Sequence, residues 1–319
     1  MKNWGLLLSK GIVFVLLFCL VDFGMGRLFV IAKNKSLERH PGDMWLKSSY
    51  TVEKVKTDCI IIGSSTAEHH YIPDVIENKT GLSTYNCGQD GCFFLYSCCL
   101  VNTLIERYSP KIIIIDINPR SLLDTDKGDE YQNMRYLSFY YDKDSVVRNF
   151  IDSKSEKNRL LYHLNSWRYN SHFVYAFYPI IHESPTQQGY IPLSPKKGYT
   201  SKKNPMHWEG NWVNSELSEL YKTINNCKER GVELIIVTSP YCAKCDNSVK
   251  EKCDEFAELL SDKGVKYINL LDVAPFNTDS SLFKGASHLN AKGAAIMSDS
   301  IANILLSMSC NDIPDAAYH

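Results

Sequence analysis

Two serines in the first quarter of the chain occupy a position that suits a nucleophile. Ser64 and Ser65 follow the apolar run 59–62 and Gly63. Four apolar, mostly β-branched residues predict a strand buried on both faces, and glycine allows a sharp turn after it. The two hydroxyls would then emerge at the carboxyl end of the strand, where parallel α/β sheets bind ligands. The alternative is a turn in which one serine caps the next helix.

A histidine near the other end of the chain is the residue that could activate such a hydroxyl. His288 lies directly before the predicted last helix, for which Asn290 is a suitable N-cap residue. A serine hydroxyl is a weak nucleophile until an imidazole within hydrogen-bond distance accepts its proton. A single loop histidine is more often structural than catalytic, so the chemistry requires both ends of the chain to meet at one edge of a sheet.

The pattern of helices and strands predicts such a sheet. Buried apolar runs alternate with amphipathic segments, which is typical of successive βαβ units. We expect strands over 58–62, 83–86, 111–116, 232–238 and 265–270, and helices over 73–79, 93–108, 215–230, 246–263 and 291–308. This order predicts a flavodoxin-like three-layer α/β sandwich with a five-stranded parallel sheet.

The regular pattern is interrupted between residues 121 and 212, where Tyr, Trp and Asn accumulate. We expect one α/β domain over 57–310 that contains this stretch as a large, partly helical insertion above the carboxyl edge of the sheet. A tail over 311–319 would follow. The aromatic residues of the insertion would form either a wall on which carbohydrate stacks or a satellite hydrophobic cluster under a long loop.

The N-terminus contains a hydrophobic segment of a different kind. Residues 11–30 are nearly continuously apolar and approach the ~20 residues that a membrane-spanning helix needs, with Asp22 and Arg27 near the outer end. We expect an N-terminal tip and a transmembrane signal anchor over 1–33, followed by a polar, aperiodic stalk over 34–56. A cleaved signal peptide is the alternative. Basic residues flank both ends of the span, so charge does not select an orientation.

Composition excludes one class of partner and leaves the cysteines open. A net charge of -1 with 22% charged residues gives no electrostatic attraction for nucleic acid. The eleven cysteines form no recognisable zinc pattern. Cys242 and Cys245 have CxxC spacing and would form a local disulfide, remain thiols or act as a redox pair. A thiol enzyme would lose activity on alkylation but would not depend on Ser65.

Four short segments, taken in order, resemble the four sequence blocks of the SGNH (GDSL-like) hydrolases. The segments are Gly63-Ser64-Ser65, Asn86-Cys87-Gly88-Gln89-Asp90-Gly91, Asn118 and His288-Leu289-Asn290. The resemblance extends over roughly residues 58–305 without the insertion. More narrowly, the chain is similar to membrane-anchored members that act on cell-surface polymers, including relatives of alginate O-acetylation proteins and of the D-alanyl transfer protein of teichoic acids.

The resemblance implies specific roles. Ser65 would be the nucleophile and His288 the general base, while Gly91 and Asn118 would join the Ser65 amide as oxyanion-hole donors. Such donors stabilise the oxygen that becomes negative in the tetrahedral intermediate. No metal or organic cofactor is implied.

Three further residues are expected around the pocket rather than in the chemistry. Ser64 and Asp90 would line it, and Asp90 could orient the oxyanion loop. His70 would shape or polarise the crevice, with packing on the helix surface as the alternative.

Two departures from the family pattern affect the expected mechanism. The first block has Gly-Ser-Ser where many members have Gly-Asp-Ser. More seriously, Gly285 occupies the position, three residues before His288, where the family usually has the aspartate that orients the histidine. Either a Ser-His dyad operates, or Asp272, Asp279 or a backbone carbonyl orients the ring.

The sequence thus predicts a single-pass membrane protein whose α/β domain is extracytoplasmic. It would be a serine esterase or acyltransferase acting on O-acyl groups, above all O-acetyl groups, of a cell-surface carbohydrate polymer. Other surface-polymer assembly proteins would be its partners. The alternative is a catalytically degenerate domain that binds a glycan or a protein partner, and Gly285 favours that alternative.

Overall fold

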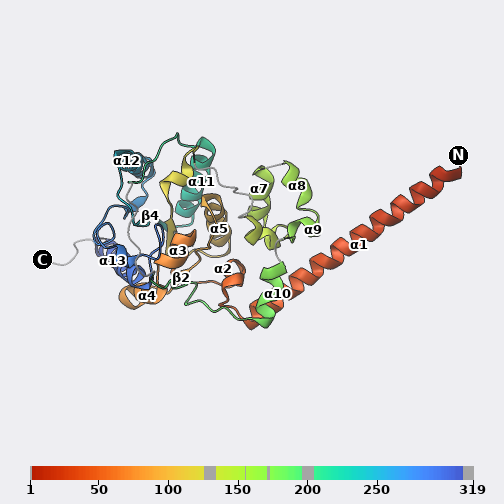
Figure 1. The fold of residues 1–319 in the computed structure, drawn as a ribbon, viewed down its shortest axis with the longest axis horizontal. Coiled ribbons are helices and arrows are strands. Elements are labelled where there is room, and N and C mark those ends of the chain that lie inside the picture. The colour runs from red at the N-terminus through yellow and green to blue at the C-terminus, as the bar shows by residue number, and fades with distance from the viewer. Residues whose placement is uncertain (1, 126–133, 155, 171–172, 196–204, 312–319) are drawn as a thin grey trace. The chain divides into compact units, whose positions relative to one another are not determined.

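The computed structural model describes residues 2–125, 134–154, 156–170, 173–195 and 205–311 of the 319-residue chain (Figure 1). The predicted tail over 311–319 lies outside these residues except for Asn311. The chain forms two compact units. The helical unit comprises 1–50 and 134–185, and the sheet unit comprises 51–133 and 186–319.

Five parallel strands form the centre of the sheet unit, in the order β2-β1-β3-β4-β5. Ile61 on β1 pairs with Asn86 on β2 and with Ile114 on β3. The strands are β1 (Cys59–Gly63), β2 (Thr84–Asn86), β3 (Ile112–Asp116), β4 (Glu233–Thr238) and β5 (Lys266–Asn269). The predicted flavodoxin-like α/β fold with a five-stranded parallel sheet is therefore confirmed.

Helices cover the sheet, as the unbroken apolar runs require. Ile60, Ile61 and Ile62 are all fully buried, which a strand achieves only when both faces of its sheet are covered. Helix α13 packs against α3 and α4, and α11 packs against α5 (Figure 1). The helices of this unit are α3 (Ser65–His70), α4 (Pro73–Thr80), α5 (Phe94–Arg107), α11 (Asn214–Glu229), α12 (Asn247–Ser261) and α13 (Ala291–Asn311), with 3₁₀ turns η2 (Pro119–Leu122) and η4 (Ser280–Leu282).

The helical unit is built around the long N-terminal helix α1. Its helices include the middle of the chain, where the sequence predicted a partly helical insertion. They are α1 (Lys2–Arg39), η1 (Met44–Leu46), η3 (Arg135–Tyr140), α7 (Ser145–Lys154), α8 (Glu156–Leu161), α9 (Asn165–Arg168) and α10 (Phe173–Ile181).

The polar, aperiodic stalk predicted over 34–56 is wrong as local structure. This stretch contains the end of α1, then η1 and α2 (Lys47–Glu53). Its polar residues serve packing and capping rather than hydration. The Ser36 hydroxyl donates to the Ala176 carbonyl at 2.9 Å, and the Asp43 carboxylate accepts the Trp45 amide at 2.8 Å and the Ser184 amide at 2.7 Å.

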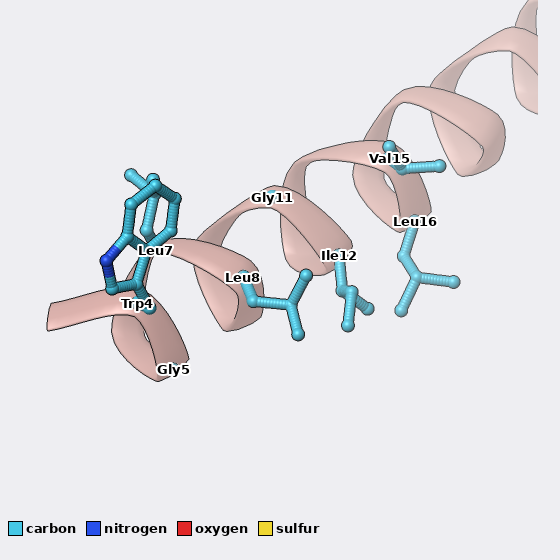
Figure 2. A pocket seen from close by; sticks show the side chains of 8 residues that line it. All are labelled: Trp4, Gly5, Leu7, Leu8, Gly11, Ile12, Val15 and Leu16. Atoms are coloured by element: carbon cyan, nitrogen blue, oxygen red, sulfur yellow. The ribbon is translucent and has the colours of Figure 1, made fainter. Parts of the chain in front are cut away.

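Helix α1 changes character at Asp22. Residues 4–21 are all exposed, and Figure 2 shows apolar side chains that project from the start of the helix. From Asp22 onward, one face of the helix is buried at a spacing of three or four residues. That face includes Asp22, Phe29, Ala32, Lys33, Ser36 and Leu37. Of the described helices, α1 is the one long and apolar enough to cross a membrane.

Candidate active site

The turn after β1 places Ser65 at the start of α3. Gly63 has φ +155°, and a Cβ there would lie 2.8 Å from the Ala67 Cβ and 2.9 Å from the Asp116 carbonyl oxygen. Only glycine fits this close approach. Ser64 is the N-cap residue of α3, but its side chain makes no capping hydrogen bond and contacts Thr66 Oγ1 at 3.2 Å instead. Ser64 therefore occupies the N-cap position that the alternative expected, but its hydroxyl does not supply the cap.

The structure brings His288 to Ser65 across the sheet unit. The His288 Nε2 lies 2.8 Å from the Ser65 Oγ. The loop is held by the Lys284 amide, which donates to the His288 carbonyl at 2.8 Å. Asn290 caps α13 by accepting the Lys292 amide at 3.0 Å, as its position before the helix predicted.

The other ring nitrogen of His288 faces a hydroxyl. Ser287 Oγ lies 3.1 Å from His288 Nδ1. The two carboxylates considered from the sequence are engaged elsewhere. Asp279 caps η4 through the Ser281 amide at 2.9 Å, and Asp272 accepts a 3.2 Å hydrogen bond from Asn277. Within the described part of the chain, the hydroxyl of Ser287 thus occupies the place that a triad carboxylate would take.

The surroundings of His288 favour its neutral form. Burial lowers the pKa of His288, and the nearby His69, whose ring centroid lies 5.6 Å away, lowers it further. The carboxylates of Asp90 and Glu68 oppose this and raise the pKa. A neutral imidazole that accepts the Ser65 proton at Nε2 must carry its own hydrogen on Nδ1 and donate it to Ser287.

One cavity of about 330 Å³ opens beside this pair. Five residues singled out from the sequence line it, namely Ser64, Ser65, Asp90, Gly91 and Asn118. Gly91 has φ +70° in the loop after β2, which L side chains rarely adopt. Asn118 Nδ2 donates to the Tyr241 hydroxyl at 3.2 Å. An amide has two N–H groups, so a second donor remains on Asn118 for a substrate oxygen.

His70 does not line this cavity, and it is fully buried rather than packed on the helix surface. Its Nε2 accepts the Leu289 amide at 3.0 Å, directly beside His288, and its Nδ1 lies 3.0 Å from the Ser239 hydroxyl. Sequence reasoning missed Ser239 and Asp116, which hydrogen-bond each other. The available signal was a charged residue ending a buried strand, since Asp116 pairs in register with Gly63.

Cys245 of the CxxC pair does not have the properties of a reactive thiol, and neither does Cys253 beside it. Burial raises the pKa of Cys245 to about 11 and that of the neighbouring Cys253 also to about 11. The thiolate is the reactive form, so these cysteines would be almost entirely protonated at neutral pH. Within the described ranges, no group of three or more His, Cys, Asp or Glu residues is placed to hold a metal ion.

Neither a protein-family model nor a curated protein matches the chain. Among solved structures, it is similar to a protein from Desulfitobacterium hafniense DCB-2 described as lipolytic and of the G-D-S-L family, with 10% identity, a TM-score of 0.42 and coverage of 78% of this chain and 99% of that one. A protein from Bacteroides fragilis described as an acylhydrolase has 9% identity, a TM-score of 0.43 and coverage of 82% and 94%. A carbohydrate acetylesterase family member from Sinorhizobium meliloti has 10% identity, a TM-score of 0.36 and coverage of 79% and 98%. Likeness at this level assigns no activity to the chain.

The class that the chain's own geometry defines is a flavodoxin-like α/β protein with a Ser-His pair beside a cavity. The pair joins the turn after β1 to the loop before α13. The chemistry of these two side chains determines what the site can catalyse.

Proposed function

We propose that the chain is a serine esterase or acyltransferase of the SGNH type, in which Ser65 is the nucleophile and His288 the general base. The observation that supports this most directly is the 2.8 Å distance between Ser65 Oγ and His288 Nε2. That distance is within the range in which an imidazole accepts a hydroxyl proton.

The reaction would proceed through an acyl-enzyme. His288 Nε2 accepts the proton as Ser65 Oγ attacks the ester carbonyl, and the resulting oxyanion would be bound by the Ser65 amide, Gly91 and Asn118. His288 then returns the proton to the leaving alkoxide. In the second half, water or a sugar hydroxyl attacks acyl-Ser65 and gives its proton to His288, which passes it to Ser65 Oγ as the acyl–Oγ bond breaks. The lowered pKa keeps His288 in the accepting form at neutral pH.

The cavity suits an acyl group on a sugar. Its volume of about 330 Å³ is at the lower end of the usual range for small-ligand sites. Phe93, which is 44% exposed, and Tyr241 line it, and aromatic rings are surfaces on which a pyranose can stack. The four-block resemblance to polymer-modifying SGNH proteins supports an O-acetylated cell-surface polymer as the substrate. Other proteins of polymer assembly are the partners that this role implies.

The membrane span is proposed to be residues 4–21 rather than 11–30, with the Lys10 side chain extended toward the N-terminal membrane interface. At 1.5 Å per residue this segment covers ~27 Å, close to the hydrocarbon thickness of a bilayer. Asp22 marks its end because its carboxylate accepts the Asn165 amide at 2.9 Å and the Ser166 amide at 2.6 Å, which fixes α1 to α9. We propose a single-pass protein whose sheet unit is extracytoplasmic, where surface polymers are modified.

The test replaces Ser65 with alanine and uses Ser64→Ala as the matched control. Hydrolysis of p-nitrophenyl acetate by S65A should fall to the uncatalysed rate, whereas S64A should keep most of the activity. A fluorophosphonate probe should label the wild type and S64A but not S65A. Unchanged hydrolysis by S65A would remove Ser65 from the chemistry.

A degenerate binding module is the second candidate, and Gly285 is the observation that favours it. Without a carboxylate on Nδ1, the imidazolium formed during attack is less stabilised. Failure of the probe to label correctly folded wild-type protein, while a control esterase reacts, would select this candidate. Calorimetric titration with acetylated and deacetylated oligosaccharides would then measure binding without turnover.

A further inference from the structure

A buried hydrogen-bonded chain runs behind the candidate catalytic pair. It begins at the Leu289 amide, which donates to His70 Nε2 at 3.0 Å. His70 Nδ1 lies 3.0 Å from Ser239 Oγ, and Ser239 Oγ donates to Asp116 Oδ2. All four residues are buried, with Asp116 at 6% and Ser239 at 2% exposure. The chain connects the loop before α13, the end of helix α3, the residue after β4 and the end of β3.

The direction of every hydrogen in this chain can be assigned. A backbone amide can only donate, so His70 Nε2 carries the lone pair and Nδ1 carries the hydrogen. Nδ1–H then donates to Ser239, whose own hydrogen points to the carboxylate. Asp116 also accepts the Tyr71 hydroxyl at 2.6 Å and the Thr66 hydroxyl at 2.7 Å. Burial raises the pKa of Asp116, whereas these hydrogen bonds and the one from Ser239 lower it and favour the ionised carboxylate.

The charge environment of His70 agrees with a neutral ring. Burial lowers the pKa of His70 well below its usual value, and His288 and His69 lower it further. The Ser287 backbone opposes this weakly. On α13, Ser298 packs against His70, and its hydroxyl lies 3.4 Å from the His70 carbonyl oxygen.

Helix α3 links the two catalytic groups through this chain. Ser65 is its first residue and His70 its last. Ser65 therefore lies at one end of a six-residue helix. At the other end, His70 accepts the Leu289 amide, which is adjacent to His288. Thr66 and Tyr71 attach the same segment to Asp116 at the end of β3. One short helix thus connects the nucleophile to the loop that carries His288.

We propose that His70, Ser239 and Asp116 are positioning residues that hold the His288 loop against Ser65, in place of the aspartate that the SGNH pattern has at the position of Gly285. The proposal rests on the proposed function of Ser65 and His288. It explains how the base can be oriented when, among the described residues, a hydroxyl is the partner of its Nδ1. A shift of about 1 Å between reacting groups can cost about 100-fold in rate, so a clamp on the loop backbone is sufficient to matter.

The kinetic test uses Ser239→Ala, which cuts the link between His70 and Asp116. Its matched control is Thr238→Val, because Thr238 is equally buried and its hydroxyl contacts the Ile117 carbonyl and the Tyr267 hydroxyl instead. We expect S239A to lower kcat by about 10- to 100-fold with KM within about twofold, and T238V to remain within about twofold of wild type.

His70→Gln is the conservative variant, since a glutamine oxygen can still accept the Leu289 amide. H70Q should retain more activity than H70A. Combining H70Q with S239A should cost little more than S239A alone, because both changes act on one chain. Equal kcat values for S239A and T238V, or fully additive losses in H70Q/S239A, would overturn the proposal.

A measurement without catalysis tests the same chain. In full-length protein carrying ¹⁵N-labelled histidine, long-range ¹H–¹⁵N spectra should show His70 as the neutral Nδ1–H tautomer at pH 7, with the signal identified by its loss in H70Q. An Nε2–H tautomer or an imidazolium would overturn the proposal even if S239A failed to fold. Hydrolysis by S65A at the wild-type rate would instead rule out the proposed function. The result for the His70 tautomer would still stand.

Discussion

Ser287 Oγ lies 3.1 Å from Nδ1 of the adjacent His288, on the ring nitrogen that a triad carboxylate would contact. A hydroxyl stabilises an imidazolium less than a carboxylate does, because it carries no charge. The proposed base, His288, is therefore correctly placed for Ser65, but its Nδ1 has a weaker partner than a triad carboxylate would be.

Gly285→Asp should supply the missing support. A Cβ at Gly285 meets nothing within 4 Å, so the substitution has room. Loss of the carboxylate in a serine protease triad costs about 10⁴-fold, so even partial restoration should raise kcat/KM by about 10-fold or more. Hydrolysis of p-nitrophenyl acetate measures the gain. G285N, of the same size but uncharged, should show no such gain, and equal effects of both variants would contradict the prediction.

The pH dependence of kcat/KM should report the lowered pKa of His288. Because the base acts in its neutral form, activity should rise with pH to a plateau, with an apparent pKa below 6.5. Asp90→Asn removes a carboxylate that raises the pKa of His288, so the rising limb should move to lower pH. His69→Gln removes a group that lowers it, so the limb should move to higher pH. Shifts in the same direction would refute this electrostatic account.

Stability should fall in mildly acidic solution because of His70. Its pKa is lowered in the folded state, so between that value and the unfolded value near 6.5 the unfolded chain binds more protons than the folded chain. The contribution is fully present above pH 6.5 and is lost as pH falls toward the folded pKa. One such group changes the free energy of unfolding by at most about 1.4 kcal/mol per pH unit.

Urea unfolding of the full chain at pH 5.5 and 7.5 measures this slope. His288 contributes in the same direction, since its pKa is also lowered. H70Q should therefore have a smaller slope than the wild type without abolishing it. A slope that H70Q leaves unchanged would show that His70 is protonated equally in both states.

The limits of the membrane span can be measured with two glycines of α1. A Cβ at Gly11 or at Gly24 meets nothing within 4 Å, so cysteine fits at both positions. In vesicles, and with Cys19 replaced by alanine, G11C should resist a water-soluble maleimide and G24C should react. Both should react in detergent. Protection of G24C would instead support a span over 11–30.

Much of the fold was evident from local sequence. The five strands lie within a few residues of the predicted ranges, because an unbroken apolar run specifies a strand buried on both faces. Asn290 was recognisable as a cap because capping depends on residues two or three positions away. The motifs around Ser65 and His288 also identified two side chains that the folded chain places 2.8 Å apart.

Other features could not be inferred because their partners are remote. The apolar run over 11–30 gives no sign that Asp22 binds the start of α9, which lies 143 positions away. Polar residues in 34–56 suggested hydration, since nothing local reveals that Ser36 bonds the carbonyl of Ala176.

The hydrogen bonds of His70 behind the candidate site also join residues that are remote in the sequence. His70 meets Ser239 across 169 positions and Leu289 across 219. Neighbouring residues specify helices, strands and caps because the relevant forces act over one or two turns of backbone. Which buried polar groups pair with one another depends on sheet register and helix packing, and those exist only once the chain has folded.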